Sequence, residues 1–166
     1  GGVETLAWAE AVFVGGGNTF RLLATLQKAK LMVAIRRRVD EGLIYMGASA
    51  GSNIAAPTIR TTNDMPIVQP ASLNALGLVP FQINPHYIDP PAGSTFMGET
   101  REERLGEYLE ENTTPVIGIR EGAWLRVENG RAWLGGSRAA RIFRRDAAPE
   151  ERDPGADLSD LLLVGD

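Results

Sequence analysis

Short apolar runs that end in glycine alternate with longer amphipathic segments in the first half of the chain. The run Ala11–Val14 stops at three glycines and predicts a strand buried on both faces. Residues 19–39 carry apolar side chains at near-helical spacing and predict one helix, which Gly42 ends. Residues 43–46 predict a second buried strand. A strand, a helix and a strand in this order form a βαβ unit, so we expect the two strands to be parallel.

Capping and turn signals divide the second half of the chain. Residues 100–109 predict a helix, because Thr100 and Glu103 have the spacing of a capping box. The dipeptide Asn129-Gly130 lies between two strand-like runs and predicts a C-terminal β-hairpin. Shorter helices are predicted at residues 4–10 and 50–55, and further strands at residues 81–84, 115–119 and 140–144. We expect an α/β protein with helices over a mainly parallel sheet, in a single domain of residues 1–166.

Composition excludes several classes of protein. The 166 residues, 43% of them hydrophobic and 23% charged, are ordinary for a globular domain. The net charge of −4 argues against nucleic acid as a main partner. The chain has no Cys, which removes disulfides, thiolate nucleophiles and Cys-based metal sites. No apolar stretch approaches the ~18 residues that a membrane span needs, and we expect no signal peptide. We therefore expect a cytoplasmic protein with no membrane partner.

The sequence Gly47-Ala48-Ser49-Ala50-Gly51 lies between a predicted strand and a predicted short helix. A sharp turn of this kind exposes a serine Oγ for nucleophilic attack, strains the serine backbone and leaves room only for small neighbours. Ser49 is therefore the candidate nucleophile. The alternative is a plain strand-to-helix turn that happens to be built from small residues.

His86 and Glu121 are the candidate partners of Ser49. A serine hydroxyl needs a nearby base, most often a histidine, and His86 is the only histidine of the chain. Both candidates follow predicted strands, where α/β proteins collect site residues, and Glu121 could hold the imidazole tautomer as a triad acid does. A structural histidine and a solvent carboxylate are the alternatives. The order Ser, His, acid excludes an α/β hydrolase, in which the acid precedes the histidine.

A glycine loop, Gly15-Gly16-Gly17-Asn18-Thr19-Phe20, lies between a predicted strand and a predicted helix. It matches neither G-x-G-x-x-G nor a P-loop, which disfavours a nucleotide site. We expect an oxyanion hole, in which the N–H groups of Gly17 and Ala50 hold the negative oxygen of a tetrahedral intermediate. A plain tight turn is the alternative. One histidine without cysteine leaves only carboxylates for zinc, so no metal or other cofactor is expected.

These features, in this order and spacing, resemble the α-aspartyl dipeptidase (peptidase E) family of class I glutamine amidotransferase-like serine peptidases. The resemblance covers most of residues 3–136. The matching stretches are Phe13–Leu23 (FVGGGNTFRLL), Gly47–Asn53 (GASAGSN), Pro57–Val68 (PTIRTTNDMPIV), Phe81–Tyr87 (FQINPHY), Gly98–Arg101 (GETR) and Gly118–Trp124 (GIREGAW). The third stretch is the most specific, because it separates this family from cyanophycinase-like relatives.

The resemblance implies a flavodoxin-like fold and a Ser-His-Glu triad, whose places Ser49, His86 and Glu121 would fill, with oxyanion donors at Gly17 and Ala50. It implies hydrolysis of dipeptides that begin with aspartate, without a metal. The partner would be a small peptide substrate, and assembly into a homo-oligomer stays open. Members of the family begin with about a further half-domain, whereas this chain begins Gly-Gly-Val rather than with Met. We therefore expect that the N-terminal part of the family fold is missing.

Specificity for aspartate requires a cation for the carboxylate of the substrate side chain. Arg101 is the first candidate, because a cation at the start of a helix is disfavoured by ~0.3–1 kcal/mol and an anion could offset this. The alternative for Arg101 is an ion pair with one of the two glutamates that follow it. Arg60, in a loop rich in donors, is the second candidate. Asn18 and Asp64 could hold the free ammonium or the backbone of the substrate.

Two other functions stay open at this point. A cyanophycinase-like exopeptidase or another amidase would use the same triad with a different pocket. A non-catalytic α/β domain would use the glycine loop to hold a phosphate or a carboxylate.

Overall fold

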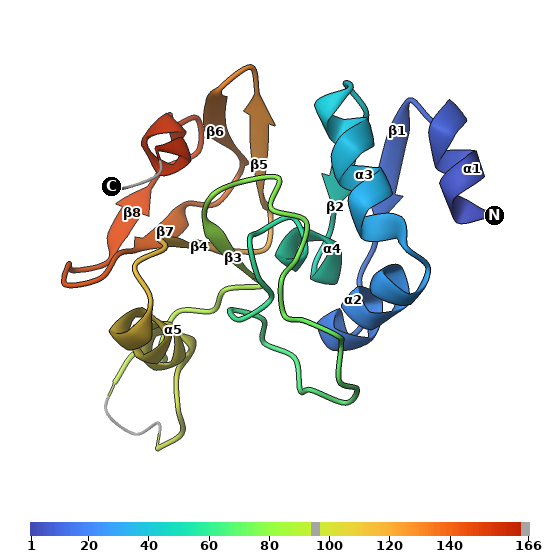
Figure 1. Cartoon of the computed structure of the whole chain (residues 1–166). Coiled ribbons are helices and arrows are strands. Elements are labelled where there is room, and N and C mark those ends of the chain that lie inside the picture. Colours follow the sequence, from blue (N-terminus) through green and yellow to red (C-terminus); the bar gives the residue numbers. More distant parts are fainter. Residues whose placement is uncertain (94–96, 164–166) are drawn as a thin grey trace. The chain divides into compact units, whose positions relative to one another are not determined.

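The structure is a computed structural model that describes residues 1–93 and 97–163. It divides into two compact parts, which we name the N-terminal unit (Gly1–Gln82) and the C-terminal unit (Ile83–Asp166) (Figure 1). Each unit has its own cluster of buried apolar side chains. That the two units form the single domain expected from the sequence stays a prediction.

Two parallel strands form the sheet of the N-terminal unit. β1 (Ala11–Val14) pairs with β2 (Ile44–Gly47) along its whole length, with Val12 opposite Tyr45. This pairing confirms the predicted parallel βαβ unit. The helices of the unit are α1 (Gly2–Trp8), α2 (Thr19–Lys28), α3 (Leu31–Asp40) and α4 (Ala50–Asn53).

The single helix predicted for residues 19–39 is wrong, because this segment forms the two helices α2 and α3. Lys30, between them, has a left-handed backbone conformation with φ 58°. Leu26 and Leu31 are five positions apart, so on one continuous helix they would face directions about 140° apart. With the break at Lys30, both leucines pack against the same buried cluster. Packing of the core therefore favours two helices over one continuous helix.

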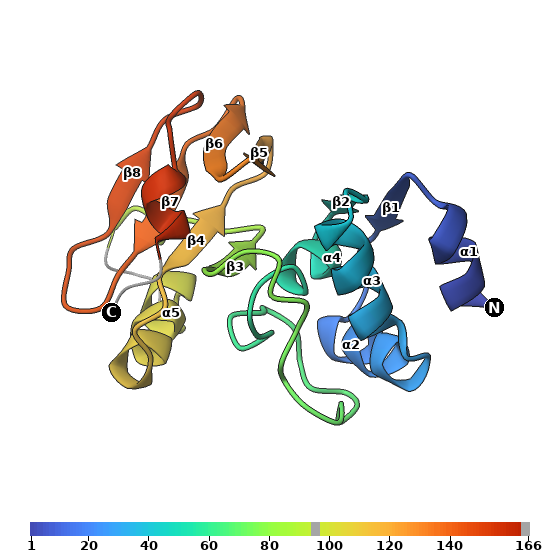
Figure 2. The ribbon, with the colours of Figure 1, turned by 45° about the horizontal axis from the view of Figure 1, so that its top comes forward.

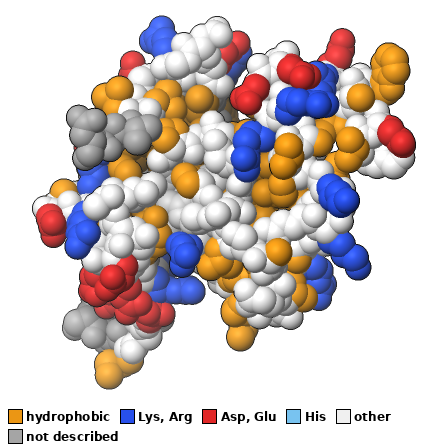
Figure 3. Space-filling model, in the orientation of Figure 1, with side chains coloured by type: hydrophobic (Ala, Val, Ile, Leu, Met, Phe, Trp, Pro, Cys, Tyr) orange, Lys and Arg blue, Asp and Glu red, His pale blue; other side chains and the backbone are white. Residues whose placement is uncertain are grey.

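The predicted burial of β1 and β2 on both faces is also wrong. Val14 is buried, whereas Phe13 and Met46, which point to the other face, are 66% and 47% exposed. The core cluster covers only one face of this two-stranded sheet. Figure 3 shows further hydrophobic side chains at the surface over α1 and α3, where Trp8 and Val33 are exposed.

Residues 54–81 contain no helix or strand, yet they are well packed. Ile54, Ile59 and Leu76 are among the most buried side chains of the unit. An isolated bridge joins Thr58 to Asn74. This long irregular segment belongs to the N-terminal unit and carries two of the predicted site residues.

A four-stranded sheet with the order β3-β4-β7-β8 forms the centre of the C-terminal unit (Figures 1 and 2). Its strands are β3 (Gln82–Pro85), β4 (Val116–Ile119), β7 (Ala140–Phe143) and β8 (Glu150–Arg152). β7 is antiparallel to both β4 and β8. A separate hairpin consists of β5 (Ala123–Glu128) and β6 (Arg131–Gly136), and the helices are α5 (Arg101–Glu111) and the short 3₁₀ helix η1 (Ser159–Leu162). The predicted α/β class with a C-terminal hairpin is confirmed. The pair β1–β2 is parallel, whereas the pairs β4–β7, β7–β8 and β5–β6 are antiparallel.

Two local signals of this unit are confirmed as well. Thr100 caps α5 through a capping box: its hydroxyl accepts from the N–H of Glu103 (3.1 Å), and its N–H donates to the Glu103 carboxylate (2.6 Å). Asn129 and Gly130 both have positive φ, 51° and 72°, as a two-residue hairpin turn requires. Within residues 1–93 and 97–163, no helix is long and apolar enough to cross a membrane.

Candidate active site

The predicted site residues divide between the two units. Six lie in the N-terminal unit and three in the C-terminal unit. They are Gly17, Asn18, Ser49, Ala50, Arg60 and Asp64 in the first, and His86, Arg101 and Glu121 in the second. Within the first unit the glycine loop lies beside Ser49, and within the second His86 contacts Glu121.

Ser49 occupies a strained turn between β2 and α4. Its backbone angles, φ 55° and ψ −113°, lie outside the regions that L-residues ordinarily adopt. Strain of this kind persists only where the surrounding structure imposes it, and it is concentrated at functional sites. The residue is half-buried at the start of α4. A strained and accessible serine at a strand-to-helix turn is the geometry that a nucleophile elbow requires.

Gly47 and Gly51 are required by the close packing of this turn. A Cβ atom on Gly51 would lie 1.9 Å from the carbonyl oxygen of Val14, and one on Gly47 would lie 2.5 Å from the carbonyl oxygen of Gly51. No side chain fits at either distance. The N–H groups of Ala48 and Gly51 donate to the carbonyls of Val14 (3.0 Å) and Gly15 (3.2 Å). These bonds fix the serine turn against the end of β1 and the glycine loop.

The glycine loop runs beside the side chain of Ser49. A Cβ atom on Gly16 would lie 3.5 Å from Cβ and 3.7 Å from Oγ of Ser49. Gly17 has φ 126°, a conformation that favours glycine. Ala50 is the first residue of α4, so its N–H is among the donors that a helix leaves unpaired. The oxyanion hole formed by the N–H groups of Gly17 and Ala50 stays a prediction.

Asn18 and Asp64 join the loop of residues 57–68 to the start of α2. Oδ1 of Asn18 accepts from the N–H of Arg21 (3.1 Å), and its amide donates to the carbonyl of Met65 (2.9 Å). One oxygen of Asp64 accepts from both the N–H (2.7 Å) and the hydroxyl (2.6 Å) of Thr19. Both side chains therefore satisfy donors at the start of α2. Their contacts with a substrate stay predictions.

His86 and Glu121 are in direct contact within the C-terminal unit. Nδ1 of His86 forms a hydrogen bond with a carboxylate oxygen of Glu121. Because an ionised carboxylate can only accept, Nδ1 of the neutral ring carries the proton and Nε2 carries the lone pair. This is the tautomer in which Nε2 can act as a base toward a hydroxyl group. The two side chains are 49% and 77% exposed.

Neighbouring strands bring this pair together. His86 directly follows β3, and Glu121 lies in the turn after β4, the next strand of the sheet. The N–H of Tyr87 donates to the carbonyl of Ile119 (2.9 Å), which continues the pairing beyond the strands. His86 has a positive φ of 53°, which is uncommon for a residue other than glycine. The segment turns sharply at the histidine and presents its ring toward Glu121.

Arg101 carries a buried guanidinium nitrogen, Nη1, that has no hydrogen-bond partner among residues 1–93 and 97–163. The residue begins α5, directly after the cap Thr100. Neither of the alternative ion pairs forms, because Glu102 pairs with Arg141 (3.2 Å) and Glu103 accepts from the N–H of Thr100 (2.6 Å). Burial lowers the pKa of Arg101, since the charged form loses contact with water. An anionic ligand would offset that loss.

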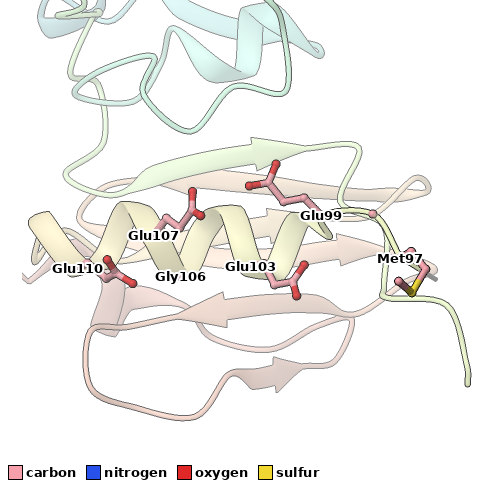
Figure 4. A pocket seen from close by; sticks show the side chains of 7 residues that line it. Met97, Glu99, Glu103, Gly106, Glu107 and Glu110 are labelled. Atoms are coloured by element: carbon pink, nitrogen blue, oxygen red, sulfur yellow. The ribbon is translucent and has the colours of Figure 1, made fainter. Parts of the chain in front are cut away.

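An open hollow of about 600 Å³ lies along α5. Its lining is strongly acidic and consists of Met97, Gly98, Glu99, Glu103, Gly106, Glu107 and Glu110 (Figure 4). It includes none of the predicted site residues, and four carboxylates would repel an acidic substrate. Across residues 1–93 and 97–163, no group of three or more His, Cys, Asp or Glu residues could hold a metal ion.

Residues 2–135 match the sequence profile of Peptidase family S51. The chain is 66% identical over 156 residues to "Peptidase E" of Streptomyces coelicolor and 52% identical over 160 residues to "Probable alpha-aspartyl dipeptidase" of Drosophila melanogaster. These alignments cover 94% and 96% of this chain but 64% and 67% of the relatives, so the chain spans about two thirds of their length. The fold is shared with the solved structure of a peptidase from an acI-B1 Actinobacterium, at a TM-score of 0.67 and 19% identity over 94% of this chain and 62% of that chain. The chain belongs to peptidase family S51.

Proposed function

We propose that this protein is a serine dipeptidase that hydrolyses dipeptides with an N-terminal aspartate. The observation that carries the proposal is the identity of 66% and 52% to relatives named Peptidase E and Probable alpha-aspartyl dipeptidase. The strained backbone of Ser49 and the contact of His86 with Glu121 support it chemically. The whole reaction is proposed for these three side chains, with no metal ion or cofactor.

In the proposed mechanism, Oγ of Ser49 attacks the carbonyl carbon of the N-terminal aspartate while Nε2 of His86 takes the hydroxyl proton. Glu121 stabilises the imidazolium, and the N–H groups of Gly17 and Ala50 hold the oxyanion. The C–N bond breaks when His86 gives its proton to the leaving amine, and an aspartyl ester remains on the serine. Water, deprotonated by His86, then attacks this ester and releases aspartate.

The side-chain carboxylate of the substrate is assigned to Arg101, because Nη1 of this residue is buried and has no hydrogen-bond partner in the part of the chain that the structure describes. Arg60, which is exposed in the loop of residues 57–68, is the second candidate. Asn18 and Asp64 are proposed to bind the free ammonium or the backbone of the substrate. Asp64 would supply the negative charge that an ammonium group requires.

The direct test compares hydrolysis of Asp-Leu, Asn-Leu and Ala-Leu by the parent protein and by Ser49→Ala. We expect Asp-Leu to be cleaved fastest and Ser49→Ala to be inactive. Reaction with a fluorophosphonate probe provides an independent readout, because an unactivated serine stays unlabelled. Normal turnover by Ser49→Ala would remove Ser49 from the mechanism.

Two alternatives have distinct outcomes in the same experiments. A cyanophycinase-like exopeptidase or other amidase would react with the probe but would cleave all three dipeptides at comparable, low rates. A non-catalytic anion-binding domain would neither react nor cleave. The cytoplasmic location, the lack of a nucleic-acid partner and assembly into a homo-oligomer stay predictions.

A further inference from the structure

Arg120, directly before Glu121, is a buried arginine whose whole guanidinium group is hydrogen-bonded. Its side chain is 9% exposed. Nε and Nη2 donate to the two carboxylate oxygens of Asp89 (2.9 and 2.6 Å), and Nη1 and Nη2 donate to those of Glu151 (2.8 Å each). Nη1 also donates to the carbonyl of Ala139 (2.9 Å). All five N–H groups of the guanidinium are therefore used.

These bonds join the two chain segments that carry the proposed base and its acid. Asp89 lies three residues after His86, and Arg120 lies one residue before Glu121. The Arg120–Asp89 pair therefore joins the same two segments as the His86–Glu121 contact, but the guanidinium that makes it is buried. Two-point pairing of this kind fixes orientation as well as distance.

The segment of His86 is also held at Tyr87. The guanidinium carbon of Arg120 lies 5.4 Å from the centre of the Tyr87 ring. Tyr87 is 3% exposed, and a Cβ atom on Gly118 would lie only 2.8 Å from its ring, so β4 needs a glycine there. Arg120 thus contacts the residues one and three positions after His86.

The network extends beyond these two segments. Glu151 also accepts from Arg141 (3.0 Å), and Arg141 pairs with Glu102 of α5 (3.2 Å). The hydrogen bonds from Arg120 lower the pKa of both Asp89 and Glu151, so both carboxylates are charged at neutral pH. The ion pairs therefore persist under the conditions in which His86 would act as a base.

The contact of His86 with Glu121 needs such support. Both side chains are largely exposed, and exposed ion pairs are individually weak because solvent screens them and the side chains lose entropy. The positive φ of His86 adds backbone strain that the surroundings must impose. From these contacts we propose that Arg120 is a positioning residue. It acts through Asp89 to keep the Glu121 carboxylate hydrogen-bonded to Nδ1 of His86. The proposal rests on the proposed function, since it assigns a role in the same triad.

Because His86 is the only histidine of the chain, its imidazole can be observed directly. The experiment uses ¹⁵N-histidine-labelled protein at about pH 9, where an ordinary imidazole is neutral. The ¹⁵N chemical shifts of the two ring nitrogens report which one carries the proton. We expect Nδ1–H to predominate in the parent protein and Nε2–H to gain population in Arg120→Met. On Asp-Leu, kcat should fall about 10- to 100-fold with little change in KM, the range typical for loss of a group that orients a metal-ligating histidine.

Arg152→Met is the matched control. Arg152 also pairs with two acids of the same unit, Glu150 and Asp160, and neither adjoins His86 in the sequence. It should lower stability without changing the imidazole shifts. Asp89→Asn is the milder variant, since Asp89 is half exposed and the bonds of Arg120 to Glu151 remain. It should shift the proton toward Nε2 even if Arg120→Met does not fold.

The readout separates this proposal from the proposed function. Unchanged Nδ1–H population in Arg120→Met and Asp89→Asn would overturn the positioning role, whatever the activity of either variant. A parent protein protonated at Nε2 would overturn it as well. Failure of the parent protein to cleave dipeptides would instead count against the proposed function, and the imidazole shifts would still decide the role of Arg120.

Discussion

Glu102 pairs with Arg141 rather than with its neighbour Arg101, with 3.2 Å between the guanidinium and the carboxylate. Glu103 is engaged as well, because its carboxylate accepts from the N–H of Thr100. Among the described residues, Nη1 of Arg101 is buried without a hydrogen-bond partner. The C-terminal unit therefore presents a cation that its own acidic neighbours leave uncompensated.

Replacing this arginine by methionine should remove the preference for an N-terminal aspartate. A hydrogen bond to a charged group contributes about 1.5–3 kcal/mol, so kcat/KM for Asp-Leu should fall about 10- to 150-fold in Arg101→Met. Hydrolysis of Asn-Leu should change little, because its side chain has no charge to match. Initial rates on both dipeptides measure the change.

Arg104→Met is the control for this comparison. Arg104 lies one turn further along α5 and forms an exposed ion pair with Glu99 (3.5 Å), so its loss should not alter the ratio of the two rates. Arg60→Met tests the second candidate in the same way. If Arg101→Met leaves the ratio of the Asp-Leu rate to the Asn-Leu rate unchanged, Arg101 does not bind the substrate carboxylate. Either Arg60 then binds it or no arginine does.

The serine turn should not tolerate a methyl group at Gly51. The added Cβ of Gly51→Ala would lie 1.9 Å from the backbone carbonyl oxygen of Val14, which cannot rotate away as a side chain could. We expect a loss of about 1–3 kcal/mol or more in the free energy of unfolding, together with loss of activity. Urea unfolding curves measure the first effect.

Gly106→Ala provides the contrast. Gly106 lies within α5, and a Cβ atom added there would meet no atom of the other described residues within 4 Å beyond the backbone of its own helix. Alanine should therefore stabilise the helix by about 0.5–1 kcal/mol. Equal unfolding midpoints for Gly51→Ala and the parent protein would show that the turn can open, which contradicts a rigid nucleophile elbow.

Local signals explain why part of this fold could be predicted from the sequence. The Asn129-Gly130 turn and the Thr100 capping box act within a few residues, and each is found where the sequence places it. The G-x-S-x-G turn is similar, because its glycines are dictated by contacts within a few residues and with the adjacent strand. The nucleophile, the base and the acid could therefore be proposed from residue type and from their places after strands.

Long-range packing explains what the sequence did not reveal. Arg120 reaches Asp89 and Glu151, each 31 positions away, because the sheet places their segments side by side. Only its position directly before Glu121 could have drawn attention to it. The break at Lys30 likewise depends on the core, and the five-residue spacing from Leu26 to Leu31 was the available signal.

Asp64→Asn should separate the helix-capping role of Asp64 from its proposed contact with substrate. Asparagine keeps an oxygen that can accept from the N–H and hydroxyl of Thr19, so the free energy of unfolding should change by less than about 1 kcal/mol. The ammonium of the substrate would lose a charged partner, and KM for Asp-Leu should rise about 10-fold or more. Denaturation and steady-state rates measure the two effects. An unchanged KM would leave Asp64 with the capping role alone.

Acid should erase the stabilising effect of Arg120. The hydrogen bonds from its guanidinium lower the pKa of Asp89 and Glu151 in the folded protein. A carboxyl whose pKa is lower in the folded state contributes stability above its unfolded pKa of about 4, and this contribution is lost as the pH falls through the folded value. Both carboxylates are 42–51% exposed, so solvent screening keeps the effect modest.

The measurement is the difference in unfolding free energy between the parent protein and Arg120→Met at pH 7 and at about pH 3. We expect the difference to shrink at the lower pH, because protonated Asp89 and Glu151 no longer form ion pairs with Arg120. Leu134→Ala serves as the reference, since its fully buried side chain has no titratable partner and its cost should be similar at both values. An equal difference for Arg120→Met at both pH values would mean that the guanidinium stabilises the unit by packing over Tyr87, not by its charge.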